Sequence, residues 1–315
     1  MEKYVVFTGG VGGAKLCLGL TEIVKSEDIL FVVNTGDDFE HLGLKICPDL
    51  DTLMYTISKE SDEERGWGRK RETWHCLDSL RELGGPSWFN LGDRDLAVHL
   101  QRTYLLNQNQ NLTDITAFLF RAFGIKHNAI PMTDDVVATT VHTKTGEALS
   151  FQDYFVRKSC APEIKSISFK KAESAKMPKR LRKVLASDEL EGIIVAPSNP
   201  FLSIEPILKV QGVRNAINNA PVPKIAISPI VNGASVKGPT DKIMSELGME
   251  VSNRSIVQHY GNLFTRLIID KSDDCEVDEI KKLGVDVVVY NTYMNDLSSK
   301  IALAEKALMA ISEVN

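Results

Sequence analysis

A glycine-rich loop near the N-terminus has the composition of a phosphate-binding turn. Gly9, Gly10, Gly12 and Gly13 follow a short β-type run and precede a helical pattern that contains Lys15. Glycines there let the backbone approach a phosphate, and the helix N-terminus adds N–H groups and a positive dipole. Lys15 occupies the third glycine position of a GxGxxG loop, and no GK[ST] follows, so this is not a Walker A loop. A tight turn that serves only the backbone is the competing interpretation.

Aspartates recur in pairs in the predicted turns. The pairs are Asp37 and Asp38, Asp49 and Asp51, Asp93 and Asp95, and Asp134 and Asp135. Carboxylates in loops beside a sheet edge can hold Mg²⁺ next to substrate phosphates, although a solvated acidic face explains any single pair. Asp49 and Asp51 are the most suggestive, because they stand where a helix is predicted to begin. Arg94, between Asp93 and Asp95, suits either a bidentate phosphate contact or an internal ion-pair cluster.

Two later loops carry small hydroxyl and amide side chains. Ser198 and Asn199 follow one predicted strand, and the segment from Ser228 to Gly233 follows another. Such groups can bind a base or a sugar, and ligands of open α/β sheets lie at the carboxyl ends of the strands. Ordinary turn chemistry explains each loop separately. Both loops follow well-defined strands, which favours a binding role.

These residues are arranged on a pattern of alternating strands and helices. Mostly apolar strands are predicted at 4–7, 29–34, 192–196, 224–228, 266–270 and 285–290. Helical spacing follows the glycine loop and recurs at 203–218, 241–247, 255–264 and 278–283. Apolar strands of this kind suit a parallel sheet covered on both faces. We therefore expect an α/β fold, a Rossmann-like three-layer α/β/α arrangement around a parallel sheet.

The middle of the chain has a different pattern. Helical signals at 96–106 and 113–123 precede alternating segments at 136–143 and 148–155 and a basic stretch at 165–182, which we interpret as a solvated face. We expect residues 1–59 and 191–315 to form the nucleotide-binding core. Residues 60–190 are then an inserted region of helices and a β-hairpin.

Composition limits the classes of partner. The 315 residues carry 37 Lys and Arg against 42 Asp and Glu, a net charge of −5 that provides no attraction for nucleic acid or an anionic membrane. No apolar run approaches the ~20 residues that a bilayer span needs. Five scattered cysteines without CxxC spacing indicate a reducing, cytoplasmic setting rather than a disulfide frame or zinc site. The histidines lack ligand spacing, and a GxSxG serine-hydrolase motif is absent.

With these motifs assembled, the chain resembles the 2-phospho-L-lactate transferase family of deazaflavin coenzyme F420 biosynthesis. The resemblance covers nearly the whole chain in order. Its motifs are FTGGVGGAK at 7–15, VVNTGDD at 32–38, PDLDTLMY at 48–55, WGRKRETW at 67–74, LGDRD at 91–95, FGIKHNAIPMTDD at 123–135, FQDYFVR at 151–157, APSNP at 196–200 and SPIVNGASVKGPTDKIM at 228–244. Each motif is weak alone, but PDLDT, LGDRD, PSNP and VKGP together are specific.

The resemblance implies a group transfer. Family members move a phospholactyl-type group from a guanosine diphosphate-linked donor to the ribityl hydroxyl of the deazaflavin Fo, with release of GMP and help from Mg²⁺. A homodimer is also implied. The family pattern assigns the donor to the glycine loop and the two later loops, the acceptor to Asn34, Asp51 and Arg94, catalysis to Asp51 and Arg94, and Mg²⁺ to Asp51 with Asp49. Asp51 can serve as base or as metal ligand, because both roles need the same position.

Departures from the family pattern leave the donor open. The loop GGVGGAK is closer to the bacterial form than to the archaeal GGTGTPK, Asn232 stands where glycine is common, and Ala196 precedes PSNP in place of glycine. The three-carbon group of the donor is accordingly lactyl, enolpyruvyl or a related group.

Two other functions compete with the transferase. The related gluconeogenesis-factor-like group resembles a sugar-nucleotide-binding regulator, but the presence of both PDLDT and LGDRD favours the transferase. An NAD-dependent oxidoreductase expects an acidic residue after the second strand, which Asp37 or Asp38 could supply. Lys15 at the third glycine position argues against that reading. A purely structural protein would leave the carboxylate and arginine loops without a role.

Overall fold

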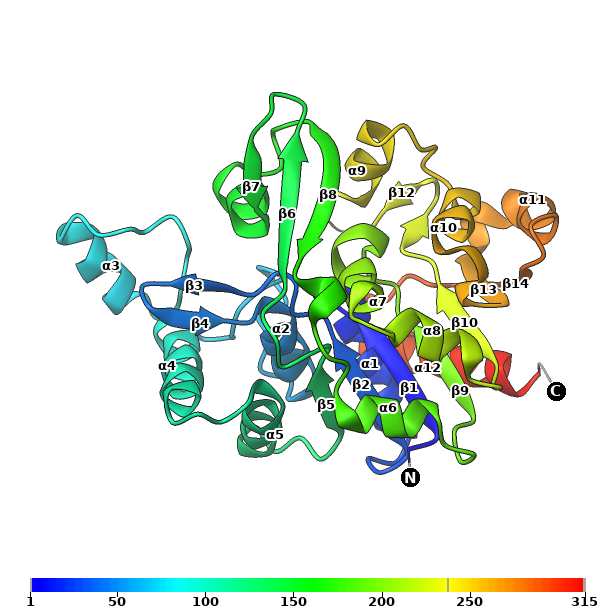
Figure 1. The fold of residues 1–315 in the computed structure, drawn as a ribbon, viewed down its shortest axis with the longest axis horizontal. Helices are drawn as coiled ribbons and strands as arrows, with labels where there is room; N and C mark the ends of the chain where they lie inside the picture. The colour runs from blue at the N-terminus through cyan, green and yellow to red at the C-terminus, as the bar shows by residue number, and fades with distance from the viewer. Residues whose placement is uncertain (1, 237, 314–315) are drawn as a thin grey trace.

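A seven-stranded parallel sheet forms the centre of the computed structural model, which describes residues 2–236 and 238–313 (Figure 1). Its strands, in spatial order, are β14 (Asp286–Tyr290), β13 (Arg266–Asp270), β10 (Lys224–Ile227), β9 (Gly192–Val195), β1 (Tyr4–Thr8), β2 (Ile29–Val33) and β5 (Asn128–Pro131). The chain leaves β1 toward β2 and β5, then returns to the other side of β1 through β9. The point where the order reverses therefore lies between β1 and β9, as in doubly wound folds. The predicted fold class is confirmed.

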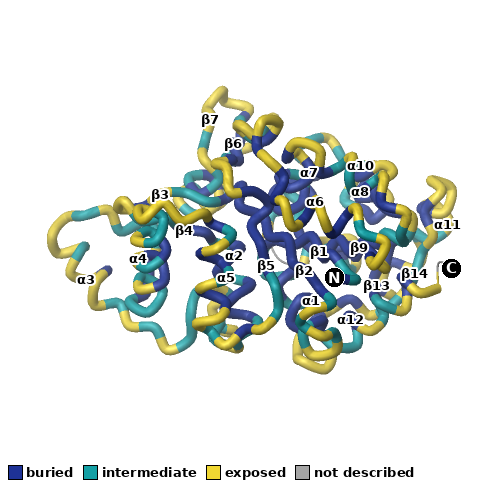
Figure 2. Tube along the Cα trace, turned by 60° about the horizontal axis from the view of Figure 1, so that its bottom comes forward, coloured by how far each residue is buried: buried dark blue, intermediate teal, exposed yellow. Residues whose placement is uncertain are grey.

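The sheet is buried on both faces because its strands are apolar at successive positions. In β1, Val6 contributes to one hydrophobic core and Val5 and Phe7 to the other. The Val6 side is covered by α1 (Gly10–Ile23), α2 (Pro48–Ile57), α5 (Leu112–Ala122) and α12 (Leu297–Ser312). The opposite side is covered by α6 (Lys179–Leu185), α7 (Glu205–Lys209), α8 (Val213–Asn219) and α10 (Asn253–Tyr260). Figure 2 shows the central strands as a continuous buried layer between these helices.

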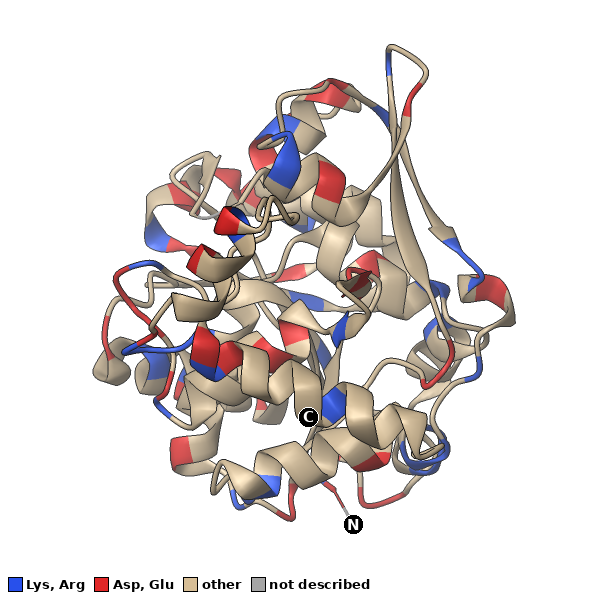
Figure 3. Ribbon diagram, turned by 90° about the vertical axis from the view of Figure 1, so that its left-hand side faces the viewer, with Lys and Arg blue, Asp and Glu red and all other residues tan. Residues whose placement is uncertain are grey.

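Smaller elements extend beyond the sheet. The hairpin β3 (Phe39–His41) and β4 (Leu44–Ile46) projects with α3 (His75–Glu82) and α4 (Asp93–Asn107) on the left of Figure 1. A separate three-stranded antiparallel sheet contains β7 (Ala148–Ser150), β6 (Ala138–Thr143) and β8 (Ile164–Lys170). The remaining elements include the hairpin β11 (Ile230–Val231) and β12 (Ala234–Ser235), α9 (Thr240–Glu246) and α11 (Val277–Lys281). Acidic and basic residues are interspersed along the chain (Figure 3).

Several elements differ from the sequence prediction. The strand β5 lies within 60–190, so the expected insertion contributes one strand to the central sheet. The predicted helix 203–218 is broken, because Gly212 adopts a positive φ of 80° between α7 and α8. The predicted alternating strand 148–155 ends at β7, after which the chain turns into a π-helical segment, Asp153–Arg157. The basic stretch at 165–182 contains most of β8 and the start of α6, and its Lys and Arg side chains are exposed, as expected of a solvated face.

Within the described residues, none of the helices combines the length and apolar character needed to cross a membrane.

Candidate functional site

A cavity of about 790 Å³ opens at the carboxyl edge of the central sheet. It is bordered by the loops after β1, β9, β10 and β14, and by one side of α2. The reversal of strand order between β1 and β9 leaves room there, because the loops that follow the two strands turn to opposite faces of the sheet. The cavity is thus where the fold and the polar loops together place a ligand.

The glycine loop forms one wall of this cavity. Gly9, Gly10 and Gly12 line it, together with Lys15 in the first turns of α1. A Cβ on Gly12 would lie 2.4 Å from the carbonyl oxygen of Pro197, so only glycine lets this loop approach the loop after β9. Lys15 Nζ donates to the carbonyl oxygen of Met294 at 2.7 Å. The loop therefore has both a packing role and a position suited to an anion.

Gly13 is the one predicted loop glycine that does not line the cavity. A Cβ there would meet the hydroxyl oxygens of Thr8 and Ser198, at 2.1 and 2.5 Å. The structure assigns Gly13 to close packing of the loop rather than to the cavity surface. Ser198 also accepts a hydrogen bond from the Gly9 N–H at 3.2 Å, which ties the two loops together.

Asp37 and Asp49 form a buried carboxyl pair beside the loop. Asn34 joins them, because its amide nitrogen donates to Asp49 Oδ2 at 2.9 Å and to Asp37 Oδ2 at 3.2 Å. Burial raises the pKa of Asp37, and the charge of Asp49 raises it further. Burial also raises the pKa of Asp49 to about 6, although the Asn34 hydrogen bond lowers it. Asn34 itself lies behind the cavity surface and holds the two carboxyl groups in place.

This pair fits a divalent cation. Asp37 Oδ1 is a buried oxygen, and the Thr139 hydroxyl is the polar side chain beside this carboxyl in addition to Asn34. Two carboxylates that destabilise each other's charge gain from a cation between them. In the described part of the chain no group of three or more His, Cys, Asp or Glu side chains is arranged as a metal site. Mg²⁺ nevertheless often takes only one or two carboxylates, with substrate phosphates and water as its other ligands.

Asp51 has a different environment from the one expected of a metal ligand. Both of its oxygens accept hydrogen bonds from the buried Arg102 of α4, one of them at 3.0 Å from Nη1. Burial alone would lower the pKa of Arg102, but the negative charge of Asp51 raises it above its ordinary value. A carboxylate held by both oxygens in this way is fixed in orientation and balanced in charge. Asp51 lines the cavity with both of its carboxylate oxygens engaged by Arg102.

A chain of polar contacts continues from Arg102 along the cavity wall. Arg102 Nη1 lies 3.0 Å from His99 Nδ1, and His99 Nε2 lies 3.3 Å from Asp95 Oδ1. The Tyr55 hydroxyl donates to the same Asp95 oxygen at 2.5 Å. Burial opposes ionisation of Asp95, but contacts with His99 and Tyr55 and the charge of Arg102 hold its pKa below the usual value. Tyr55, Asp95 and His99 line the cavity, as does Asp51, the partner of Arg102.

The loops after β9 and β10 reach the cavity through Ser198, Asn199 and Ser228. Asn199 also has a structural role, because its side-chain oxygen accepts from the backbone N–H groups of Phe201 and Leu202 and caps the following turn. The Ser228 hydroxyl accepts from the Ile230 N–H at 3.1 Å.

Gly233 lies outside the cavity wall. It forms the two-residue turn between β11 and β12 with Asn232, and both have positive φ, 68° and 53°. An Asn-Gly pair suits this turn, since asparagine tolerates positive φ better than most residues. The departure of Asn232 from the family pattern thus has a local backbone reason. Lys237, in the same motif, lies outside the described residues.

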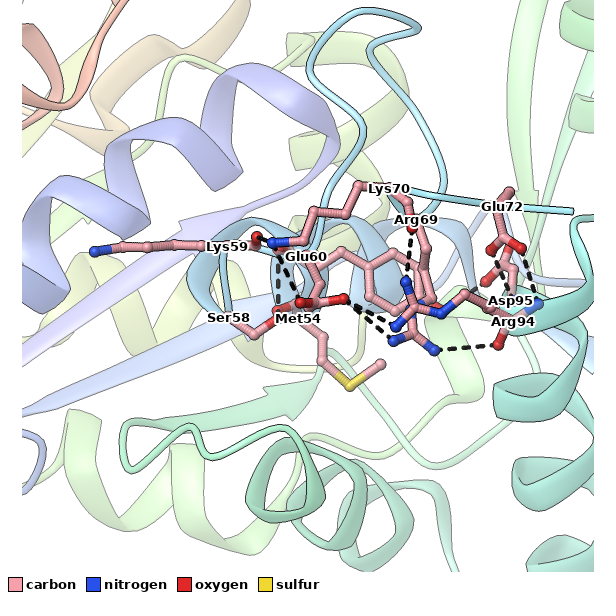
Figure 4. A network of polar contacts seen from close by, with 10 residues as sticks. Met54, Ser58, Lys59, Glu60, Arg69, Lys70, Glu72, Arg94 and Asp95 are labelled. Carbon is pink, nitrogen blue, oxygen red and sulfur yellow. Dashed lines mark hydrogen bonds and ion pairs between the residues drawn. The ribbon is translucent and has the colours of Figure 1, made fainter.

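Arg94 is not brought to the cavity. Its guanidinium donates to Glu60 Oε2 at 3.2 Å and to the Lys70 carbonyl oxygen at 2.8 Å, and Figure 4 shows it in a network with Arg69. The neighbouring Asp93 caps α3 by accepting from the backbone. Of the two interpretations of Arg94, the internal ion-pair cluster agrees with its contact to Glu60. The residue of the LGDRD motif that lines the cavity is Asp95.

Aromatic side chains form a large part of the cavity lining. Those that line the cavity are Tyr55, Trp67, Phe89, Phe151, Phe155 and Tyr293. Phe151 and Phe155 are stacked, with ring centroids 5.2 Å apart. A flat ring system with a polar side chain fits a cavity whose lining combines aromatic and acidic side chains.

Sequence reasoning missed Arg102 and treated His99 as an ordinary core or surface residue. The only signal available was spacing, since Asp95, His99 and Arg102 recur at intervals of four and three residues and so share one side of α4. That side faces Asp51 and Tyr55, which are themselves four residues apart on α2.

Comparison with known proteins gives a consistent result over the whole chain. Residues 4–293 match the family model described as CofD, 2-phospho-L-lactate transferase. A phosphoenolpyruvate transferase of Streptomyces griseus is 38% identical over 317 residues, covering 99% of each chain. A 2-phospho-L-lactate transferase of Methanosarcina mazei is 35% identical over 307 residues, covering 97% of this chain and 99% of its own.

A solved structure supports the fold. The crystal structure of a member of the UPF0052 family from Bacillus halodurans superposes with a TM-score of 0.64, covering 98% of this chain and 99% of that one. Its sequence identity is 14%, so the likeness concerns the fold alone.

Proposed function

The chain belongs to the CofD family of 2-phospho-L-lactate transferases, and on that basis we propose that it transfers a phospholactyl or phosphoenolpyruvyl group to the terminal ribityl hydroxyl of Fo. The donor is the corresponding guanosine diphosphate-linked compound, and GMP is the second product. The observation that carries the proposal is the single cavity in which a glycine loop, a carboxyl pair and an aromatic wall meet. These are the surfaces that a diphosphate, a cation and a flat ring require.

The reaction forms one bond and breaks one. The acceptor hydroxyl oxygen attacks the phosphorus that bears the three-carbon group, and the bond from that phosphorus to the bridging oxygen of GMP breaks, with the electron pair leaving on GMP. The hydroxyl proton passes to a carboxylate of the cavity, for which Asp51 is the candidate. Because phosphoryl transfer depends mainly on positioning and on stabilising charge, the protein needs no covalent nucleophile.

The donor is proposed to bind between the glycine loop and the loops after β9 and β10. The backbone N–H of Gly12 and the Lys15 ammonium, which border the cavity, would contact the diphosphate. Ser198, Asn199 and Ser228 would contact the guanosine, since their hydroxyl and amide groups border the same cavity.

Asp37 and Asp49 are proposed to hold Mg²⁺, in place of the Asp49 and Asp51 pair suggested by the motif. When bound, the ion neutralises charge on the diphosphate during transfer. Asn34 supports this role by fixing one oxygen of each carboxylate. Asp51, held by Arg102, has a fixed oxygen with which to orient the attacking hydroxyl.

A titration tests this proposal. The purified protein is added to Fo, and the deazaflavin fluorescence is followed with and without Mg²⁺ and GDP. We expect saturable binding that GDP and Mg²⁺ together strengthen, and we expect the variant Asp49→Asn to lose the effect of Mg²⁺. Binding of NAD or a sugar nucleotide with no binding of Fo would contradict the proposal. The expected homodimer is tested in the same samples by light scattering after size-exclusion chromatography.

A further inference from the structure

Two cationic side chains of the described residues line the cavity, Lys15 of α1 and Arg65 of the loop that follows α2. The proposed function gives Lys15 to the diphosphate and leaves Arg65 without a role. Four carboxyl groups also line the cavity, those of Asp37, Asp49, Asp51 and Asp95. Carboxylates repel an anionic group of a ligand, whereas a cation attracts it. Arg65 therefore provides a second place in the cavity for an anion.

Arg65 lies in a loop that is closed by backbone hydrogen bonds. At the base of the loop, the Lys70 N–H donates to the Glu60 carbonyl oxygen at 2.8 Å. Further along, the Asp62 N–H donates to the Gly68 carbonyl oxygen at 3.1 Å. The Arg65 N–H itself donates to Asp62 Oδ1 at 3.0 Å. The backbone that carries Arg65 is thus fixed within the loop.

The Arg65 side chain is oriented by an aromatic ring. Its guanidinium carbon lies over the Trp74 ring, 4.8 Å from the ring centroid. Its Nε lies 3.7 Å from Asp62 Oδ2, which is an ion pair but is too long for a hydrogen bond. The guanidinium makes no hydrogen bond to the part of the chain that the structure describes, and the side chain is 38% exposed. Its terminal N–H groups are therefore available to a ligand.

Arg65 and Lys15 belong to segments that contact the same end of α12. Glu63, two residues before Arg65, forms an ion pair with Lys300 in the first turn of α12, at 3.7 Å. Lys15 Nζ donates at 2.7 Å to the carbonyl oxygen of Met294, just before α12 begins. The two cations therefore border the same part of the cavity.

The transferred group of the proposed donor carries a charge of its own. In a lactyl or enolpyruvyl group, the carbon bonded to the phosphate ester oxygen also bears a carboxylate. This carboxylate is close in covalent structure to the phosphorus that the acceptor attacks, so it must lie near the diphosphate. A guanidinium binds a carboxylate through two parallel N–H groups, which a lysine ammonium does not reproduce. Arg65 has the chemistry and the position to bind it.

We propose that Arg65 binds the carboxylate of the donor's three-carbon group through its terminal N–H groups. This contact selects donors whose transferred group is a carboxylic acid, and it orients the phosphorus toward the acceptor hydroxyl. The inference rests on the proposed function, because it takes the donor to carry a three-carbon acid. Trp74 and Asp62 are positioning residues that hold the guanidinium.

The test compares each donor with a neutral analogue. Dissociation constants are measured by isothermal titration calorimetry for GDP, for the guanosine diphosphate-linked lactyl and enolpyruvyl donors, and for the carboxamide of each donor. Mg²⁺ is present and Fo is left out, so that no transfer occurs. Wild type should bind one of the donors at least about 10-fold more tightly than its carboxamide, the effect of a charge-assisted hydrogen bond.

Variants of Arg65 assign this preference to its guanidinium. In Arg65→Gln, the donor and its carboxamide should bind equally, while the affinity for GDP stays at the wild-type value. Arg65→Lys, which keeps the charge but not the planar fork, should retain part of the preference. Arg71→Gln is the matched control and should leave every affinity unchanged, because Arg71 lies in the same segment, is exposed and is not among the residues that line the cavity.

The outcomes separate this inference from the proposed function. A carboxylate preference that survives in Arg65→Gln would overturn the inference. An equal loss of affinity for donor, carboxamide and GDP in that variant would also overturn it, since a contact with the diphosphate would explain the loss. In both cases a wild type that still transfers the three-carbon group to Fo leaves the proposed function standing. A wild type that binds GDP but neither donor, and leaves Fo unmodified, would contradict the proposed function itself.

Discussion

Removing the Arg102 side chain alone should lower the free energy of unfolding strongly. Removing the charge of its partner Asp51 as well should restore much of that loss. Arg102 and Asp51 are 2% and 5% exposed, and their side chains make two hydrogen bonds to each other. Arg102→Met fills a similar volume but leaves the Asp51 carboxylate buried without a counter-charge. Breaking a buried ion pair on one side costs about 3–5 kcal/mol. In Asp51→Asn/Arg102→Met, no buried charge remains at this pair, so the loss should be smaller than in the single variant.

The measurement is urea denaturation followed by far-UV circular dichroism for wild type, both single variants and the double variant. We expect a coupling energy of at least about 2 kcal/mol from this double-mutant cycle. Arg81→Met is the matched control, because its partner Asp78 lies 2.9 Å away and the two side chains are 48% and 60% exposed. An exposed pair of this kind contributes less than about 1 kcal/mol. Additive losses for Arg102 and Asp51, or equal losses for Arg102→Met and Arg81→Met, would refute the reasoning.

Three further predictions follow from the site. Burial raises the pKa of Asp49 to about 6 from an ordinary value near 3.8, so the folded chain holds more protons than the unfolded chain between those values. The Asp49 contribution should therefore make the free energy of unfolding fall as pH rises from about 4 to about 6, and urea titrations of Asp49→Asn in metal-free buffer should lack that part of the slope. Gly12→Ala places a Cβ 2.4 Å from the Pro197 carbonyl oxygen and should cost about 1–3 kcal/mol by urea denaturation; an unchanged midpoint would contradict the predicted clash. Arg94→Gln should keep kcat/KM within about threefold of wild type, because Arg94 lies in a half-exposed network away from the cavity. An exposed ion pair contributes less than about 1 kcal/mol. A loss of about 100-fold or more would return Arg94 to the catalytic site.

The central sheet could be predicted from the sequence because its strands are buried on both faces and read as short apolar runs. The strand predicted at 266–270 matches β13, and those at 192–196 and 224–228 extend one residue past β9 and β10. The edge strand β5 was missed, since Asn128–Pro131 is short and contains a proline. The amphipathic helix α12 follows the last strand and was not predicted, although its N-cap Asp296 and Ser299 form a capping box.

Part of the site was also readable from single motifs. The glycine loop, Asp49, Asp51, Ser198 and Asn199 were expected from local patterns, and the structure brings them to one cavity. These residues could be predicted because each lies in a turn or at a helix start that its neighbours in sequence already indicate.

The rest of the site depends on how two helices face each other. Arg102, His99 and Asp95 belong to α4, and their partners Asp51 and Tyr55 belong to α2. Spacing along one helix shows which residues share a side, but it gives no information on which helix that side contacts. The same limit explains Arg94, which adjoins Asp95 in sequence and points to a different cluster.

The most direct test of the proposed transferase is the product of a single incubation. The protein, Fo and Mg²⁺ are mixed with each guanosine diphosphate-linked three-carbon donor in turn, and the deazaflavin and nucleotide products are separated and identified by mass spectrometry. The account predicts a deazaflavin that has gained the phosphorylated three-carbon group of one donor, with one GMP released for each molecule formed. It also predicts that Asp49→Asn, folded as judged by circular dichroism, loses most of this product. Intact Fo and intact donor after incubation with folded protein, for every donor of the series, would contradict it.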